Sequence, residues 1–377
     1  MTQQKKIYVI AGEASGDLHA SNLMQAMLDR DPNINFRFWG GDKMKHVQSA
    51  GLVKHIRDLA FMGFWEVITN IRKILKNITF CKEDILEYAP DAILLVDYPG
   101  FNLRIAEWAH EKGIKVIYYI SPQVWAWKQK RVHKIKKVVD KMYVILPFEK
   151  EFYEQFDYEV DYVGHPLLDE IAKHGFNDEQ RSQFYQRHDL DERPIIAVLP
   201  GSRRQEVSKK LPIMLDALKL FPDYQVIIAG APSLDAEFYA PFNSENVKMI
   251  SNETYALLAS SEAAVVTSGT ATLETALFKI PEVVCYKSSR FSYEIAKRLV
   301  KVKYISLVNL IMDQEVVKEL IQADCNANAI RKELSRLLND DEYRAKLMFN
   351  YKELEKILGG GGASDKVAQS LLRELEK

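Results

Sequence analysis

The sequence KKIYVIAGEASGD at residues 5–17 joins a short apolar run to a turn of small residues. A second stretch of the same kind, PIIAVLPGSRRQE, occupies residues 194–206. Each apolar run predicts a buried strand, and a helical pattern follows each turn, so each stretch opens a parallel βα unit. Such a turn leaves backbone N–H groups free at the start of a helix, where anions and sugars bind. Two such turns indicate two doubly wound α/β domains that face each other across a central cleft.

The rest of the chain supports this division into two domains. A chain of 377 residues exceeds the size of one typical core. Apolar runs of strand length alternate with helical patterns, which predicts parallel sheets covered on both faces. These further strands are expected at Ala92–Val96, Val116–Ile120, Met142–Leu146, Val160–Val163, Gln225–Ala229, Ala263–Thr267 and Glu282–Tyr286. The series restarts after VGHPLLDEI, so we place the domain junction near Gly164–Asp169. The run Gly359–Gly362 breaks a helical pattern before a last helix.

Composition narrows the class of protein. A formal net charge of −1 gives no overall attraction to nucleic acid or to anionic lipid, so any such attraction must be local. The three scattered cysteines, Cys81, Cys285 and Cys325, indicate a reducing compartment. The first apolar run is too short for a signal peptide, and no run has the eighteen apolar residues of a membrane span. We expect a cytosolic protein or one on the cytosolic face of a membrane.

The turn at Ala11–Asp17 lacks the glycine spacing of a dinucleotide site and the Gly-Lys-Ser/Thr of a P-loop. It is either a ligand loop or a tight turn in which Ser15 or Asp17 caps a helix. The carboxylate of Asp97 closes the apolar strand AILLV. At the carboxyl end of a central strand it is a candidate general base; the alternative is a structural Asp that holds the turn after it.

Two stretches in the second half suit a nucleotide. In Leu199–Arg203, a glycine turn is followed by a guanidinium that can hold a diphosphate, unless Arg203 and Arg204 are surface residues balanced by Glu206. In Thr267–Glu274, hydroxyls at a helix start suit a phosphate and the carboxylate suits a ribose diol. The alternative is an ordinary N-cap followed by a carboxylate that the helix dipole favours.

Residues 61–78, FMGFWEVITNIRKILKNI, form a broad apolar helical stripe with basic flanks. Such a stripe is typical of a helix lying in a membrane interface, and equally of a helix facing a core. The residues assigned to the interface are Phe61, Met62, Phe64, Trp65, Ile68, Ile71, Arg72 and Leu75. The basic run Lys128–Lys137 can meet lipid phosphate or form a solvated helix face. No His, Cys or carboxylate spacing predicts a metal site, and no nucleic-acid motif is present.

These motifs together resemble the lipid A disaccharide synthases, which are inverting glycosyltransferases of the two-domain GT-B type. The resemblance runs nearly end to end. It rests on AGEASGD, MGFWEV (62–67), DYPGFN (97–102), SPQVWAWKQKRV (121–132), LPFEKEFY (146–153), VGHP (163–166), LPGSRRQEV (199–207), SGTATLE (268–274) and AKRLVKVKYISLVNL (296–310).

The resemblance implies that the sugar of UDP-2,3-diacylglucosamine is transferred to 2,3-diacylglucosamine 1-phosphate, giving a β-1,6-linked disaccharide 1-phosphate and UDP. It implies two Rossmann-like domains, with residues 1–166 and a C-terminal helix at about 345–377 binding acceptor and membrane, and residues 167–344 binding the UDP-sugar. It implies neither a cofactor nor a metal, places the enzyme on the cytoplasmic face of the inner membrane, and is compatible with a homodimer.

The resemblance and the motifs together give a set of site residues. Donor-side residues are Gly201, Ser202, Arg203, Ser268, Gly269, Thr270, Glu274 and Asn309. Acceptor-side residues are Glu13, Ser15, Gly16, Asp17 and Asn102, and Asp97 and Arg203 are the expected catalytic residues. The alternatives are another UDP-sugar enzyme of the same fold, such as a lipid-linked N-acetylglucosaminyl transferase or a UDP-sugar epimerase, and a non-catalytic nucleotide- or lipid-binding protein on the membrane face.

Overall fold

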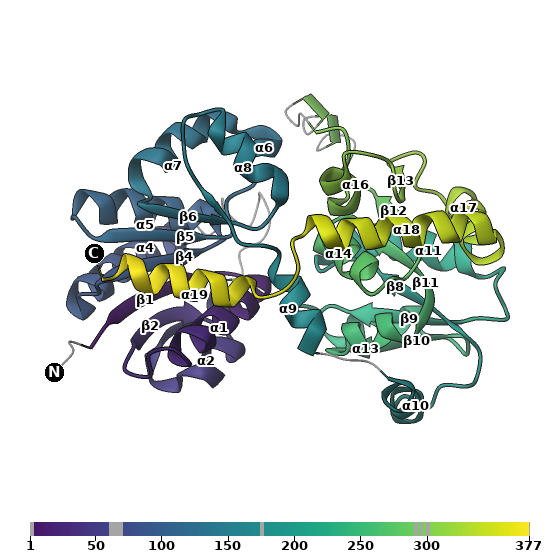
Figure 1. The fold of residues 1–377 in the computed structure, drawn as a ribbon. Coiled ribbons are helices and arrows are strands. Elements are labelled where there is room, and N and C mark those ends of the chain that lie inside the picture. The colour runs from purple at the N-terminus through teal and green to yellow at the C-terminus, as the bar shows by residue number, and fades with distance from the viewer. Residues whose placement is uncertain are drawn as a thin grey trace. The chain divides into compact units, whose positions relative to one another are not determined.

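The computed structural model describes residues 4–59, 71–173, 177–289, 293–294, 297–298 and 302–376. The chain forms two compact units (Figure 1). The first contains Met1–Asp169 and Gly359–Lys377, and the second contains Glu170–Leu358. The sequence analysis put the divisions at 166 and 344. The later point differs because helix α18 (Asp341–Ile357) packs within the second unit, so only the chain after Leu358 returns to the first.

The described part of the first unit is built on a seven-stranded parallel sheet with the order β3-β2-β1-β4-β5-β6-β7. Its strands are β1 (Lys6–Ala11), β2 (Asn35–Gly40), β3 (Leu52–His55), β4 (Ala92–Val96), β5 (Lys115–Tyr119), β6 (Lys141–Val144) and β7 (Asp161–Tyr162). Its helices are α1 (Ala14–Leu28), α2 (Asp42–Val47), α4 (Ile71–Tyr88), α5 (Pro99–Glu111), α6 (Val124–Trp127), α7 (Val132–Val138), α8 (Pro147–Glu154) and α19 (Ala363–Glu374). Helix α9 (Pro166–Lys173) contains the point where the units divide.

The described part of the second unit has a six-stranded parallel sheet with the order β10-β9-β8-β11-β12-β13. Its strands are β8 (Ile195–Leu199), β9 (Gln225–Gly230), β10 (Val247–Ser251), β11 (Ser261–Thr267), β12 (Glu282–Tyr286) and β13 (Lys318–Ile321). Besides α18, its helices are α10 (Asp178–Arg187), α11 (Arg204–Leu218), α12 (Ala236–Tyr239), α13 (Thr254–Ala259), α14 (Thr270–Leu277), α16 (Leu307–Met312) and α17 (Ala327–Asn339). The prediction of two parallel-sheet α/β domains is therefore confirmed.

Each sheet has one point where the order of strand addition reverses. In the first unit it lies between β1 and β4, and in the second between β8 and β11. At such a point the two βα turns lead away from each other and leave a crevice at the carboxyl ends of the strands. The turns that contain the predicted site residues follow β1, β4, β8 and β11. Most candidate residues therefore lie at the two reversal points.

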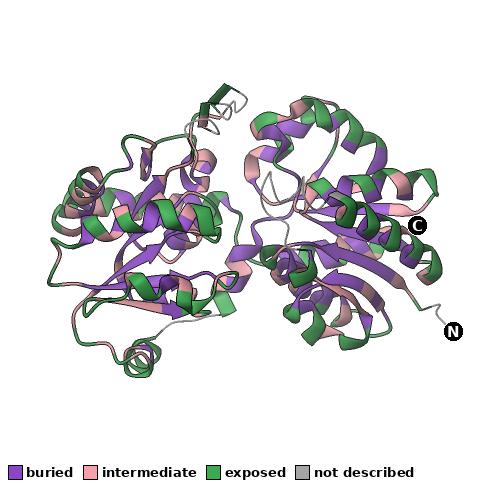
Figure 2. Ribbon diagram, turned by 180° about the vertical axis from the view of Figure 1, so that it is seen from behind, coloured by how far each residue is buried: buried purple, intermediate pink, exposed green. Residues whose placement is uncertain are grey.

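Four strands lie outside the sequence prediction: β2, β3, β10 and β13. Strands β3, β10 and β13 lie at sheet edges, and most of their residues are only half-buried. An edge strand pairs on one side only and does not need the continuous apolar run that marks a central strand. The central strands β4, β8 and β9, by contrast, are buried throughout (Figure 2).

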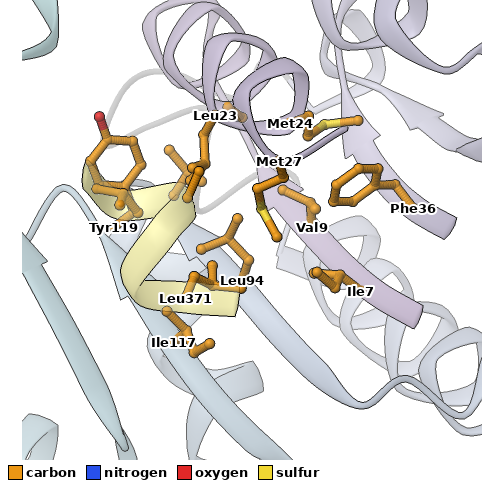
Figure 3. Close-up of a cluster of buried hydrophobic side chains, with 14 of the residues drawn as sticks. Ile7, Val9, Leu23, Met24, Met27, Phe36, Leu94, Ile117, Tyr119 and Leu371 are labelled. Atoms are coloured by element: carbon orange, nitrogen blue, oxygen red, sulfur yellow. The ribbon is translucent and has the colours of Figure 1, made fainter. Parts of the chain in front are cut away.

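The hydrophobic core of the first unit joins the two ends of the unit's sequence. Val9 and Leu94 on neighbouring strands pack with Met27 of α1 and with Leu371 of α19, all fully buried (Figure 3). Helix α19 is also fixed at its start, where Asp169 accepts hydrogen bonds from the backbone N–H groups of Gly362 and Ser364. The C-terminal segment is thus part of the first core rather than an appendage.

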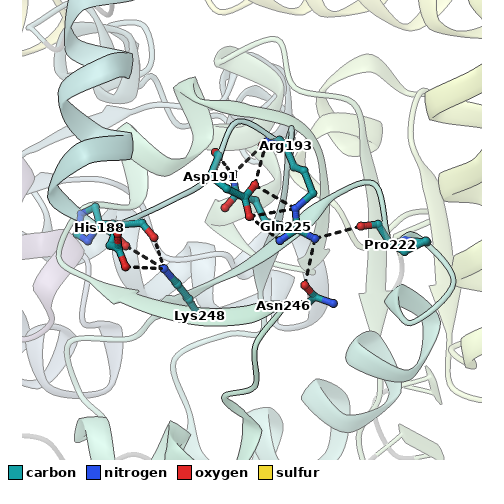
Figure 4. Close-up of polar contacts among 8 residues, drawn as sticks. His188, Asp191, Arg193, Pro222, Gln225, Asn246 and Lys248 are labelled. Atoms are coloured by element: carbon teal, nitrogen blue, oxygen red, sulfur yellow. Dashed lines mark hydrogen bonds and ion pairs between the residues drawn. The ribbon is translucent and has the colours of Figure 1, made fainter.

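A polar cluster closes the amino edge of the second sheet (Figure 4). The Arg193 guanidinium binds both oxygens of Asp191 and donates to the Pro222 carbonyl and to Asn246 at 3.1 and 3.0 Å. Lys248 Nζ donates to the His188 and Asp189 carbonyls. Because protein oxygens surround both cations, we assign this cluster to holding loops together and not to binding an anion.

Replacing Leu371 by Ala should destabilise the first unit by about 2–5 kcal/mol, because it leaves a cavity in a fully buried cluster. All five tryptophans precede Asp169, so denaturant unfolding followed by tryptophan fluorescence reports on this unit. The matched control is Gln369→Ala on the exposed face of the same helix, which should change the midpoint little. Equal effects of the two substitutions would show that α19 does not complete this core.

Candidate functional site

Two residues in an unusual backbone conformation form the turn after β4. Asp97 and Tyr98 have φ values of +46° and +48°, the left-handed region that side chains with a β-carbon rarely adopt. The Tyr98 ring covers Gly12, where a β-carbon would lie 2.3 Å from the ring, so the turn after β1 must have glycine here. Consecutive strained residues persist only where the surroundings fix them, and they are typical of functional sites.

Asn102 and Tyr118 supply that fixation. The fully buried Asn102 directs Nδ2 at the Asp97 carbonyl at 2.7 Å and at the Val96 carbonyl at 3.3 Å. The Tyr118 hydroxyl donates to the same Asp97 carbonyl at 2.6 Å. Asn102 therefore positions the backbone of Asp97.

The Asp97 carboxyl has an altered acidity. Burial and, to a smaller extent, the negative charge of Glu13 raise its pKa to about 7, and the hydrogen bond from the Tyr98 backbone N–H opposes the shift. A carboxyl that exchanges its proton near neutral pH suits a general base. The structure thus brings together Asp97 and Glu13, which the sequence predicted to lie on the acceptor side.

Two other acceptor-side predictions have structural roles. Asp17 is buried, and its carboxylate accepts from the backbone N–H groups of Gly41, Lys43 and Met44 at 2.6, 3.1 and 3.1 Å. It therefore caps α2, a helix 24 residues further on. Gly16 is buried within α1, whereas Ser15 is exposed at the start of that helix.

In the second unit, the turn after β8 exposes Arg203. Gly201 has a φ of +103°, which requires glycine, and Arg203 stands at the N-cap of α11 with its side chain 61% exposed. Its guanidinium lies 3.3 Å from Oε1 of Glu206. Arg204 stacks on the Phe238 ring at 4.6 Å, so Arg203 is the more accessible of the two guanidinium groups.

The neighbouring turn after β11 contains Ser268, Gly269 and Thr270. Gly269 is the N-cap of α14 and offers no capping side chain, and Thr270 is exposed. The first backbone N–H groups of α14 therefore suit an anion. The Ser268 hydroxyl donates to the Ile305 carbonyl at 2.7 Å, which ties this turn to the segment before α16.

Glu274 lies one turn further along α14. The Tyr255 hydroxyl donates to its Oε1 at 3.2 Å. Burial raises the pKa of Glu274, and the hydrogen bond from Tyr255 acts in the opposite direction. The carboxyl is thus held in place by a neighbour, as a group that binds a diol must be.

The side chain of Asn309 is fully engaged within the second unit. Its amide is fully buried and donates to the Val317 carbonyl and to Glu319 Oε1, both at 2.9 Å. Its Oδ1 accepts from the N–H groups of Val316 and Val317 at 2.8 and 3.0 Å. All hydrogen-bonding positions of the side chain are used by protein partners. The side chain thereby anchors α16.

Two carboxyl groups in the structure, the half-buried Glu319 and the buried Glu149, were not predicted from the sequence. Glu319 accepts from the N–H groups of Ile305 and Ser306 and so fixes the segment that meets Ser268. Glu149, at the carboxyl edge of the first sheet, accepts from Ser121 Oγ at 2.6 Å, and burial raises its pKa to about 7. Glu149 also accepts from the Leu146 N–H three residues away, which is a local signal, whereas Ser121 and the partners of Glu319 lie further away in the sequence.

The surface around α6 and α7 is aromatic and basic. Trp127 is 47% exposed, and Lys128 Nζ lies 4.0 Å from the centre of its ring. Lys130, Arg131 and Lys137 are exposed and form no ion pair with the described part of the chain. Within the described residues, no helix is long and apolar enough to cross a membrane, and no three His, Cys, Asp or Glu residues cluster as metal ligands.

The predicted interfacial stripe lies mostly outside the described residues. Phe61, Met62, Phe64, Trp65, Ile68 and the side chain of Ile71 belong to the undescribed part. In α4, Arg72 is exposed and Leu75 is 52% exposed, whereas Ile78 faces the core at 8% exposure. The helix therefore has both an exposed apolar residue and a core-facing side.

Solved structures of low sequence identity share this fold. The chain aligns with a UDP-GlcNAc 2-epimerase from Neisseria meningitidis at a TM-score of 0.69 and 15% identity, covering 98% of this chain and 100% of that one. It aligns with a glycotransferase of kitacinnamycin at a TM-score of 0.65 and 13% identity, covering 99% of each. Both likenesses support the GT-B arrangement of two parallel-sheet units and, at this identity, the fold alone.

Other proteins have a much higher sequence identity to this chain than these solved structures do. A lipid-A-disaccharide synthase of Trichlorobacter lovleyi is 39% identical over 99% of this chain and 98% of its own length. One from Coxiella burnetii is 38% identical over 97% of each. The family model described as lipid-A-disaccharide synthetase matches residues 7–368. With full-length relatives of this identity and a family match over nearly all of its residues, this chain belongs to the lipid-A-disaccharide synthetase family.

Proposed function

We propose that this chain is the hexosyltransferase that joins UDP-2,3-diacylglucosamine to 2,3-diacylglucosamine 1-phosphate, with inversion at the anomeric carbon and without a metal. One observation carries the proposal beyond family membership. A carboxyl with a pKa of about 7 lies at the reversal point of one sheet, and an accessible guanidinium beside two helix N-termini lies at that of the other. These are the groups that an inverting transfer from a diphosphate needs.

The second unit supplies the donor side. The departing UDP gains negative charge on its diphosphate as the bond to the sugar breaks. Arg203 and the uncapped start of α14 can stabilise that charge, because a guanidinium and helix N–H groups both favour phosphate oxygens. Glu274, held by Tyr255, is placed to accept hydrogen bonds from the ribose hydroxyls.

The first unit supplies the acceptor side. The 6-hydroxyl of the acceptor sugar attacks the anomeric carbon in line with the departing diphosphate, and Asp97 accepts the hydroxyl proton as the new bond forms. The burial that raises its pKa makes the carboxylate a stronger base than an exposed Asp. Glu13 and Ser15 complete this side of the site, and Asn102 holds the Asp97 backbone.

Because both proposed substrates carry acyl chains, the enzyme must act at a membrane surface. We assign this surface to the exposed Trp127 and to Lys130, Arg131 and Lys137, which form no ion pair with the described residues, and to the exposed Leu75 of α4. An aromatic side chain with adjacent cations suits an interface that contains anionic phosphate groups. We propose the cytoplasmic face of the inner membrane as the place where this surface works. No observation in the structure favours the epimerase alternative, because its likeness extends to the fold alone.

The reaction is tested by UDP release in mixed micelles containing EDTA, with and without the acceptor. Release should require the acceptor and yield the disaccharide phosphate. Asp97→Asn should lower kcat by about 10²–10⁴-fold, the usual contribution of a general base, while UDP binding is retained. Arg203→Ala should weaken UDP binding as well. Acceptor-independent release, or near-normal turnover by Asp97→Asn, would contradict the proposal.

The altered pKa of Asp97 predicts opposite effects of pH on activity and stability. The base works when ionised, so kcat/KM should rise with pH to a plateau above about pH 7. The carboxyl pKa is raised in the fold, so ionisation destabilises the native state increasingly as pH rises above the unfolded value. Asp97→Asn should therefore become the more stable protein as pH increases from about 4 to about 8.

Glu13→Gln provides the matched variant for this experiment. It removes a charge that raises the Asp97 pKa, so the midpoint of the kcat/KM profile should move to lower pH. Thermal unfolding and initial rates over the same pH series measure both effects. An unchanged midpoint, or an Asp97→Asn protein that is less stable throughout, would identify Asp97 as a structural residue.

The membrane surface is tested by sedimentation with vesicles of neutral or anionic lipid. Neutralising Lys130 and Arg131 by Gln should weaken binding to anionic vesicles by about tenfold or more, since each cation near such a surface contributes about 1 kcal/mol. The control is Lys346→Gln with Lys352→Gln on α18, which removes the same charge from exposed positions of the second unit. Equal losses in both proteins would indicate a net-charge effect and remove this assignment.

A further inference from the structure

Lys210 is a buried lysine beneath the turn that carries Arg203. It lies on α11 with its side chain only 2% exposed. Its one ion pair within the described residues is with Glu206, whose Oε2 lies 3.8 Å from Nζ. A buried ammonium is costly unless it is paired, so a lysine at this position needs a reason.

The ammonium lies close to the glycine of the turn. A β-carbon on Gly201 would be 3.3 Å from Glu206 Oε2, 3.5 Å from Thr267 Cγ2 and 3.8 Å from Lys210 Nζ. The cation therefore sits where the turn after β8 meets the end of β11. Thr267 is itself 6% exposed, and its hydroxyl has no hydrogen-bond partner in the described structure. A buried cation and an unused hydroxyl together line the floor of the donor turn.

Glu206 is shared by two cations. Its Oε1 lies 3.3 Å from the Arg203 guanidinium, and its Oε2 faces Lys210. Two positive groups and one negative group leave one positive charge in the cluster. Without Lys210, the carboxylate would serve Arg203 alone and neutralise the guanidinium that has to meet a diphosphate.

We propose that Lys210 is a positioning residue for the donor, which by engaging Glu206 keeps the charge of Arg203 available to the UDP diphosphate. The inference rests on the proposed role of Arg203 in binding that diphosphate. The protonation of Lys210 agrees with this role. Burial lowers the pKa of Lys210, and the carboxylate of Glu206 opposes that shift and so favours the charged form.

A purely structural role makes a different prediction. If Lys210 served only to fill space, Met would replace it with little loss, because an apolar side chain of similar length avoids the desolvation of a charge. Lys210→Met should then leave UDP binding unchanged and alter only the unfolding temperature. The two roles are therefore separated by measuring affinity and stability on the same variants.

The experiment is a double-mutant cycle read by calorimetric titration with UDP, with thermal unfolding of each protein. Lys210→Met should weaken UDP binding by about tenfold, within the range of coupling expected for groups in one charge network. Adding Glu206→Gln to Lys210→Met should restore binding to within about threefold of the wild type, because the competing carboxylate is gone. The control is Lys209→Met, which removes the same charge from an exposed position of α11 and should leave UDP binding unchanged.

The outcomes separate this inference from the proposed function. Unchanged UDP binding by Lys210→Met, failure of Glu206→Gln to restore it, or an equal loss in Lys209→Met would overturn the role of Lys210. Arg203→Ala tests the underlying assumption. If that variant binds UDP as the wild type does, the proposed diphosphate contact itself is wrong, whatever the result for Lys210.

Discussion

The parallel pairing of β1 with β4, and of β8 with β11, is the constraint on which the rest of the structure depends. Each pair joins strands distant in sequence, from which the chain proceeds outward in opposite directions. The turns that follow paired strands therefore diverge and leave their backbone N–H groups and side chains accessible at the carboxyl edge. Asp97 and Glu13 share one such edge, and Arg203 and Ser268 share the other. The strand order therefore fixes where the candidate site residues lie, whichever side chains occupy the turns.

Around these turns, buried and half-buried polar groups hold the backbone in conformations it would not otherwise keep. Asn102 and Tyr118 donate hydrogen bonds to the carbonyl of Asp97, whose backbone is in the left-handed region. Glu319 accepts hydrogen bonds from the backbone N–H groups before α16. Each of these hydrogen bonds replaces a water molecule by a fixed protein partner. The bond satisfies the hydrogen-bonding capacity of the backbone group and limits its motion. The burial that makes these groups effective also raises the pKa of Asp97 and Glu149. Rigidity and altered acidity thus have the same physical origin here.

Sequence reasoning located the turns but not the partners of their side chains. The central strands and the small-residue turns are local signals, and the structure has them where the apolar runs end. The protein partners of Asp17 and Asn309 could not be predicted, because a capped helix start, or a pair of backbone N–H groups, is contributed by other segments. Glu149 and Lys210 each have a partner close in the sequence, the Leu146 N–H and Glu206, but their burial could not be predicted from that spacing. The edge strands were missed because half-buried strands such as β3 have no continuous apolar run. What remained unpredictable was long-range pairing of polar groups.

The return of α19 to the first unit has a consequence for synthesis on the ribosome. Asp169 and Gly362, which meet at the start of this helix, are 193 residues apart in the chain. The nascent first unit therefore emerges with its sheet complete but with the groove that receives Leu371 uncovered, and stays so while the whole second unit is translated. The apolar residues that line the groove are exposed during that interval, and exposed apolar surface is what chaperones bind. The first unit begins folding before the second, yet it is the last to finish.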